Sequence, residues 1–180
     1  MINAYITIGG QGTRLKCLSP KDKHKLYYKD KRIVDWILSI VPEAQLLGNK
    51  KTNNRKETLS AIANQQNILI IDCDIIPFGL DLSLIDTETD NIFVFESNKH
   101  KWGSAKIENK ILVSCDENNN ISNYKCSGIY YIKNMQKTLG EMNDNSIASG
   151  IIGAKTIVEN SFARFGDVED YMEAISYDYN

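Results

Sequence analysis

The sequence predicts an α/β fold built around a largely parallel sheet. Short apolar runs alternate with longer stretches in which apolar residues recur at helical spacing, and this order favours strand–helix–strand units. One run, Ile68-Leu69-Ile70-Ile71, is continuously apolar, which is typical of a strand covered on both faces. The length of 180 residues, without a repeat or a Pro/Ser-rich linker, predicts a single domain over residues 1–180.

The expected strands follow from the apolar runs in chain order. Each is short and rich in residues that favour strands, such as Ile, Val, Tyr and Phe. They cover residues 4–8, 44–47, 68–74, 92–96, 111–114 and 129–132. The polar run 116–120 is expected to form an exposed turn.

Three stretches are expected helices. In residues 32–41, the apolar side chains of Ile33, Ile37 and Ile40 fall three or four positions apart, so they share one helix face. In residues 57–65, Leu59 and Ile62 would point inward. Residues 168–174 are the expected closing helix.

Composition and charge argue against several classes of protein. The formal net charge of −2 gives no electrostatic support for a nucleic-acid partner. No apolar run approaches the roughly 18 residues that cross a bilayer, and no secretory signal is expected, so we expect no membrane partner. The cysteines form no C-x-x-C pair, which predicts no zinc site, reduced thiols and a cytoplasmic protein.

The most informative segment is Gly9-Gly10-Gln11-Gly12-Thr13-Arg14-Leu15, which directly follows the first expected strand. Glycine tolerates positive φ and lets backbone N–H groups approach an anion closely. Successive N–H groups in such a loop form a concave anion site, and Arg14 adds a forked donor that matches phosphate oxygens. The segment therefore predicts a phosphate-binding loop in an enzyme that handles a nucleotide.

A pair of acids, Asp72 and Asp74, ends the central apolar strand. In open α/β sheets, ligands lie beyond the carboxyl ends of the strands, so the acids and the glycine-rich loop are expected at one edge. Mg²⁺ prefers one or two carboxylates together with phosphate oxygens and water. We therefore expect Asp74 to hold Mg²⁺. Whether Asp72 also binds the metal stays open. The alternative for Asp74 is a purely structural role as a turn residue at the end of the strand.

A locally basic segment, residues 21–32, follows the glycine-rich loop and contains Lys23 and Lys25. A solvated loop would have this composition, and so would a loop that faces phosphates. The neighbouring glycines favour the second interpretation.

Residues 9–15 match the G-G-x-G-T-R-L signature of the sugar-phosphate nucleotidylyltransferases, and the chain resembles that family over nearly its whole length. Weaker matches follow in the family's order: residues 23–34 for K-x-L-L-P-I-x-x-K-P-x-I, 57–61 for G-T-A-x-A, 70–74 for a strand ending in G-D, 122–130 for S-N-Y-x-x-x-G-x-Y and 165–171 for D-x-G-T-x-E-D-Y. The resemblance implies a Rossmann-like three-layer sandwich with a mostly parallel central sheet, of the GT-A-type nucleotide-diphospho-sugar transferase fold.

The resemblance also implies an activity: transfer of a nucleoside monophosphate from an NTP to a phosphorylated acceptor, with release of pyrophosphate. The acceptor would be a small molecule such as a sugar phosphate, and the product an activated precursor for glycan or surface polysaccharide synthesis. The attacking phosphate oxygen is already ionised at neutral pH. Such a reaction needs positioned cations and Mg²⁺ more than a general base.

The family's functional positions carry over residue by residue. Arg14 and Lys23 would be the catalytic cations, with Lys25 as the alternative to Lys23. Asp74 and Asp167 would hold Mg²⁺. The residues that would contact the nucleotide are Gly9, Gly10, Gln11, Gly12, Thr13 and Thr58.

Two departures from the family pattern bear on specificity. Glu57 stands where the family has glycine, and Ser114 and Cys115 lie where a sugar-binding Glu-Lys pair is expected. The base, the acceptor and the oligomeric state, including a homo-oligomer, stay open. Two other functions also stay open: a GT-A-type glycosyltransferase that uses Asp72-Cys73-Asp74 to hold a metal and a nucleotide sugar, and a nucleotide-binding module without turnover.

Overall fold

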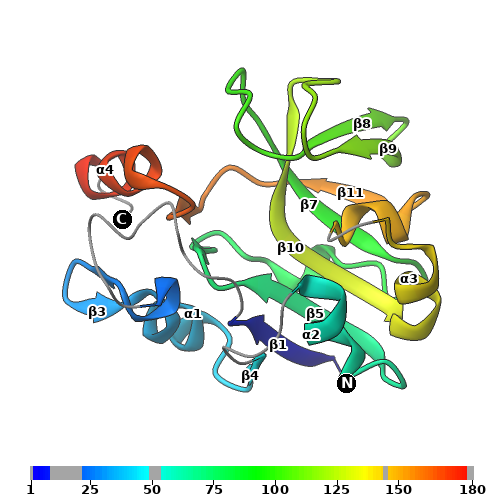
Figure 1. Cartoon of the computed structure of the whole chain (residues 1–180), viewed down its shortest axis with the longest axis horizontal. Helices are drawn as coiled ribbons and strands as arrows, with labels where there is room; N and C mark the ends of the chain where they lie inside the picture. The colour runs from blue at the N-terminus through cyan, green and yellow to red at the C-terminus, as the bar shows by residue number, and fades with distance from the viewer. Residues whose placement is uncertain (1, 9–21, 49–53, 144–145, 178–180) are drawn as a thin grey trace.

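The computed structural model describes residues 2–8, 22–48, 54–143 and 146–177 (Figure 1). The strands are β1 (Asn3–Thr7), β2 (Tyr27–Tyr28), β3 (Lys31–Arg32), β4 (Gln45–Leu47), β5 (Gln66–Asp72), β6 (Ile75–Ile76), β7 (Asn91–Glu96), β8 (Ser104–Glu108), β9 (Ile111–Asp116), β10 (Tyr124–Asn134), β11 (Lys155–Val158) and β12 (Ala163–Arg164). The α-helices are α1 (Ile33–Ile40), α2 (Arg55–Ser60), α3 (Met135–Glu141) and α4 (Val168–Ser176), and the 3₁₀ turns are η2 (Lys23–Lys25), η3 (Leu82–Leu84) and η4 (Ala148–Ile151).

Eight strands form one sheet in the order β4-β1-β5-β10-β7-β11-β9-β8. β1 is parallel to β4 and β5, and β7 is parallel to β11. β10 is antiparallel to both β5 and β7, and β9 is antiparallel to β11 and β8. An additional pairing of β10 with β8 closes the strands from β10 to β8 into a ring. In Figure 1 the β8–β9 hairpin lies at the top, far from β4.

The α/β fold is confirmed, but the sheet is mixed, and the expected mostly parallel Rossmann-like sandwich is not confirmed. The difference comes mainly from β10, which lies in the middle of the sheet and is antiparallel to both of its neighbours, β5 and β7. This strand was expected as the short run 129–132 and extends over Tyr124–Asn134. An apolar run shows that a strand is buried, but its composition does not say in which direction the strand runs. The parallel part of the sheet near the acids is β4-β1-β5.

Helices cover both faces of the sheet. On one face, Ile33 and Ile37 of α1 and Ala174 of α4 belong to a buried cluster that includes Ile71 of β5. On the other face, the buried cluster contains Ile70 of β5, Leu59 of α2 and Met135 of α3, together with Ala148 and Ile151 of η4. Successive residues of a strand point to opposite faces, so β5 contributes to both clusters.

The expected helices are present with shifted ends. Helix α2 begins at Arg55 because Asn54 caps it, with the Asn54 side chain accepting a hydrogen bond from the Glu57 N–H at 2.7 Å. The sequence pattern did not predict α3, β8 or β11. Within the described part of the chain, no helix has the length and apolar character needed to cross a membrane.

Candidate functional site

The candidate site lies where β1 and β5 end side by side. The two strands are parallel, with Thr7 in register with Asp72, so both carboxyl ends reach the same edge. The Thr7 hydroxyl donates a 2.8 Å hydrogen bond to Oδ1 of Asp72. The chain therefore leaves β1 next to the acidic pair. The glycine-rich loop follows β1 in the sequence and lies outside the described residues. The expected site residues that it contains are Gly9, Gly10, Gln11, Gly12, Thr13 and Arg14.

Asp72 is held by a cation that the sequence analysis did not single out. Nη2 of Arg55, at the start of α2, lies 3.0 Å from Oδ2 of Asp72, whose side chain is only 11% exposed. Burial raises the pKa of Asp72, and the neighbouring Asp74 charge adds to this, while Arg55 and the Thr7 hydrogen bond oppose it. The Asp72 charge in turn raises the pKa of Arg55. Asp72 thus anchors Arg55 and β1 at the end of β5.

Asp74 is paired with Lys23. Nζ of Lys23 lies 2.9 Å from Oδ2 of Asp74, and both side chains are mostly buried. Burial alone would raise the pKa of Asp74, but Lys23 and then Arg164 outweigh it, so the pKa lies below its usual value. Lys25 instead pairs with Asp22 at 3.0 Å on the surface. Of the two candidate lysines, Lys23 is the one that reaches the acid.

Asp167 lies at the start of α4 and near the segment that contacts Asp74. The Phe165 N–H donates to the Asp74 carbonyl at 2.8 Å, so the chain passes Asp74 just before reaching Asp167. The Asp167 carboxylate caps α4 by accepting from the Asp170 N–H at 2.9 Å, and it also lies 3.2 Å from Nζ of Lys101. The two expected metal acids thus each have a lysine partner, Lys23 for Asp74 and Lys101 for Asp167.

The donor set fits Mg²⁺ bound together with a nucleotide. Asp74 and Asp167 would supply carboxylate oxygens, and each side chain keeps 23% of its surface exposed. Across residues 2–8, 22–48, 54–143 and 146–177, no three His, Cys, Asp or Glu side chains form a metal-binding group. One or two carboxylates are what Mg²⁺ uses when phosphate oxygens and water complete its shell.

Thr58, expected near the base, is buried within α2. Its hydroxyl donates to the Asn54 carbonyl at 3.3 Å. Its methyl group would lie 3.0 Å from a Cβ at Gly48, the residue with φ +110° that follows β4. Thr58 therefore fixes α2 against the end of β4 and helps to place Arg55.

A glycine lets β10 approach the acids. The pairing of β10 with β7 shifts register between Cys126 and Tyr130, and Gly128 between them has φ +90°. A Cβ there would lie 2.9 Å from Oδ2 of Asp72 and 2.3 Å from Cδ1 of Ile75. This close approach needs glycine, because other residues rarely adopt positive φ and their Cβ would collide.

Glu117 is an acid that the sequence analysis did not single out, and its charge acts on Arg55. It follows β9, which extends to Asp116 rather than ending at Ser114. Oε1 of Glu117 accepts a 2.7 Å hydrogen bond from Ser146, and its charge acts on Arg55 and raises the pKa of Arg55 along with Asp72. In the sequence, Glu117 stands two residues after Cys115, near the place where the family pattern has a Glu-Lys pair.

No family model and no curated protein matches the chain. Solved structures share its fold. A CTP:phosphocholine cytidylyltransferase from Streptococcus pneumoniae superposes with a TM-score of 0.79 at 13% identity, over 97% of this chain and 98% of that one. An inositol-1-phosphate CTP transferase from T. maritima gives 0.74 at 13% identity, over 97% and 94% of the two chains. A nucleoside-diphosphate-sugar pyrophosphorylase from Vibrio cholerae gives 0.70 at 16% identity, over 98% and 100%.

Proposed function

We propose that the chain is a single-domain nucleotidyltransferase that uses Mg²⁺ and moves a nucleoside monophosphate from an NTP to a small phosphorylated acceptor. The fold supports this, because nucleotidyltransferases and a pyrophosphorylase share it over nearly the full length. The observation that carries the proposal is the Lys23–Asp74 pair, which lies where β5 ends beside β1. A cation and an acid that would bind the metal therefore lie beside the end of β1, which the glycine-rich loop follows in the sequence.

In the proposed reaction, an oxygen of the acceptor phosphate forms a bond to the α-phosphorus of the NTP. The bond from that phosphorus to the oxygen bridging to the β-phosphate breaks, and pyrophosphate leaves with the bonding electron pair. No proton has to be removed from the nucleophile. The chain therefore has to position two anions and neutralise their charge, which is the main part of catalysis in such transfers.

The residues divide this work. Lys23 would neutralise the α-phosphate and the incoming phosphate, and Arg14 would stabilise the departing pyrophosphate. Asp74 and Asp167 would hold Mg²⁺, which supplies charge screening when it is bound. The glycines and Thr13 of the loop would hold the triphosphate, and Thr58 would support the side of the site that receives the base.

The test is acceptor-dependent release of pyrophosphate. The protein is incubated with Mg²⁺, each of the four common NTPs and a panel of phosphorylated acceptors, and Lys25→Ala is the matched control for Lys23→Ala. Pyrophosphate that appears only with an acceptor, and falls sharply in Lys23→Ala alone, supports the proposal. In a parallel reaction that supplies a nucleotide sugar in place of the NTP, its consumption without pyrophosphate release would favour the glycosyltransferase. Saturable nucleotide binding without any product would indicate that the chain is a nucleotide-binding module without turnover.

A further inference from the structure

Arg164 is a cation of β12 that no carboxylate of the described residues pairs with. Its guanidinium makes one hydrogen bond in this part of the chain, from Nη1 to the carbonyl of Cys126 at 3.1 Å. Nε of the same group is buried and has no hydrogen-bond partner. Buried donors are normally paired, because an unpaired donor costs free energy. The described residues thus leave the hydrogen bonding of Arg164 incomplete.

Aromatic rings hold this guanidinium in a fixed position. Cζ of Arg164 lies 4.8 Å from the ring centre of Trp102 and 5.2 Å from that of Phe95. The Phe95 ring in turn meets the ring of Phe162 edge to face, with centroids 4.9 Å apart. Ring faces stabilise a cation without removing its charge. Arg164 is therefore a positioned positive charge.

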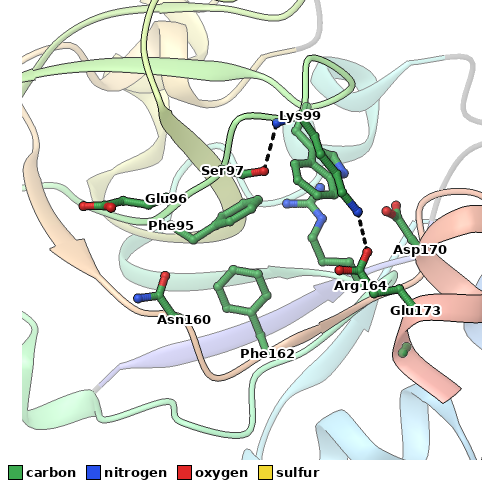
Figure 2. A pocket seen from close by; sticks show the side chains of 11 residues that line it. Phe95, Glu96, Ser97, Lys99, Asn160, Phe162, Arg164, Asp170 and Glu173 are labelled. Atoms are coloured by element: carbon green, nitrogen blue, oxygen red, sulfur yellow. Dashed lines mark hydrogen bonds and ion pairs between the residues drawn. The ribbon is translucent and has the colours of Figure 1, made fainter. Parts of the chain in front are cut away.

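Arg164 also lines a pocket of about 370 Å³ between the end of β7 and α4 (Figure 2). The other charged groups of the lining are paired or point elsewhere. Glu173 and Asp170 of α4 each lie 2.6 Å from a lysine ammonium, which is that of Lys99 in the case of Glu173. Figure 2 shows the Glu96 side chain pointing away from Arg164. Among the described residues, Arg164 is the cation of this lining that lacks a counter-ion, so the ligand that suits it is an anion.

The same arginine adjoins the acid of the candidate site. Where β6 and β12 pair, Arg164 is in register with Ile75, the residue after Asp74. The next residue, Phe165, donates its N–H to the Asp74 carbonyl at 2.8 Å. The charge of Arg164 also acts on the Asp74 carboxyl, where it is, after Lys23, the second cation that lowers the pKa. One side chain thus lines the pocket and acts on the acid that is expected to bind Mg²⁺.

We propose that Arg164 is a third catalytic cation, and that its guanidinium binds the phosphate of the acceptor while the rest of the acceptor lies in the pocket. The inference rests on the proposed function. The planar guanidinium presents its N–H donors in a fork that matches two phosphate oxygens, and it keeps its proton throughout the reaction. Arg164 shares the incoming phosphate with Lys23. Two positive charges thereby meet the two anions that have to react.

The experiment measures pyrophosphate release by Arg164→Gln and Arg164→Lys at varied concentrations of the NTP and of glucose 1-phosphate or glycerol 3-phosphate. Arg164→Gln should lower kcat/KM for the acceptor about 100-fold, the size typical of losing one donor aimed at a reacting anion, and leave the KM for the NTP within about threefold. Arg164→Lys keeps the charge without the fork and should lose about tenfold. Inorganic phosphate should compete with the acceptor, with an inhibition constant about tenfold higher in Arg164→Gln.

A second arginine serves as the matched control. Arg32 pairs with Asp35 at 2.6 Å on the surface, so Arg32→Gln should leave all these constants unchanged. Circular dichroism and thermal melting establish that each variant is folded, because Arg164 packs on two rings. If Arg164→Gln does not fold, Arg164→Lys takes its place in every comparison.

The outcomes separate this inference from the proposed function. Equal effects of Arg164→Gln on the acceptor and on the NTP, as a merely structural role would give, would overturn the inference and keep the nucleotidyltransferase. A kcat/KM for the acceptor within about twofold of the native value would also overturn it. If no acceptor gives pyrophosphate, the proposed function fails, and calorimetric titration with inorganic phosphate then decides about Arg164. Binding that weakens at least about tenfold in Arg164→Gln would support the phosphate site, whereas equal binding, or no binding by the native protein, would overturn it.

Discussion

Replacing Lys23 with alanine tests the site most directly, because Lys25 offers a control from the same 3₁₀ turn. Lys23 contacts Asp74 at 2.9 Å and keeps 17% of its side chain exposed, whereas Lys25 contacts Asp22 and keeps 45% exposed. A fixed charge aimed at a reaction centre typically contributes a factor of about 10² to 10³ in kcat, or about 3–4 kcal/mol. We expect Lys23→Ala to lose this factor, and Lys25→Ala to stay within about twofold, because exposed pairs contribute little.

The same substitution should change how stability depends on pH. In the native protein, the pKa of Asp74 lies below its usual value because Lys23 and Arg164 outweigh burial. A carboxyl group whose folded pKa lies below the unfolded value, about 3.9, stabilises the fold above that pH. This contribution is lost as the pH falls through the folded pKa. In Lys23→Ala, the main cation that lowers the pKa of Asp74 is gone, so burial raises this pKa. The stability lost relative to the native protein should therefore be larger at pH 7 than near pH 2.

Three measurements check the reasoning. Pyrophosphate release gives kcat for both variants, urea denaturation at pH 7 and near pH 2 gives the stability difference, and carbon NMR of the carboxyl groups follows Asp74. Circular dichroism confirms that each variant is folded before its rate is compared. Equal kcat values for Lys23→Ala and Lys25→Ala, or an Asp74 titration that does not move, would refute the assignment of Lys23 to the site.

Substitutions at three further positions test other parts of the site. Asp167→Asn should keep the cap of α4, since Asn is a good N-cap, yet lower Mg²⁺-dependent turnover by about two orders of magnitude. Asp167→Ala should lose the same turnover and also about 1 kcal/mol of stability. Equal thermal stability of the two variants would contradict the capping role. Gly128→Ala should destabilise the fold by about 2 kcal/mol or more in urea, because its Cβ would meet Ile75 and Asp72 at positive φ; an unchanged midpoint would contradict the close approach. Arg55→Gln removes the cation that pairs with the buried Asp72 carboxylate and opposes the rise of its pKa. Since burial already raises the pKa of Asp72, the lost stability should be recovered as Asp72 protonates on acidification, and an equal loss at pH 7 and pH 4 would contradict this.

The part of the site that the sequence could predict depends on strands of strong local character. The apolar run before the glycines and the run ending in Asp72 and Asp74 are both short and distinct. Parallel neighbours end at the same edge, and β1 and β5 do so here, in register at Thr7 and Asp72. Local pattern and the geometry of α/β sheets were sufficient for this step.

The rest depends on contacts between segments far apart in the chain. Arg55 lies among several lysines and polar residues, and only the position of α2 against β5 brings it to Asp72. The charge of Glu117 acts on Arg55, which is 62 positions away in the sequence, and the β8–β9 hairpin that precedes Glu117 is joined to the main sheet by β10. The direction of β10 and its irregularity at Gly128 likewise follow from the way the ring of strands closes. No periodicity within a single segment contains this information.

The charges around Asp74 resolve a difficulty in the proposed reaction. The carboxylates that would hold Mg²⁺ and the phosphates that must approach them are all anions, and they repel one another. Lys23, Arg164 and Arg55 all act on Asp74, so three cations surround the two acids at the end of β5. The interaction of such partly buried charges is screened much less than that of surface charges. The net charge of −2 therefore argues against a nucleic-acid partner but not against a triphosphate, because a small anion responds mainly to the charges nearest to it, and Lys23, Arg55 and Arg164 act on the acids at this strand end.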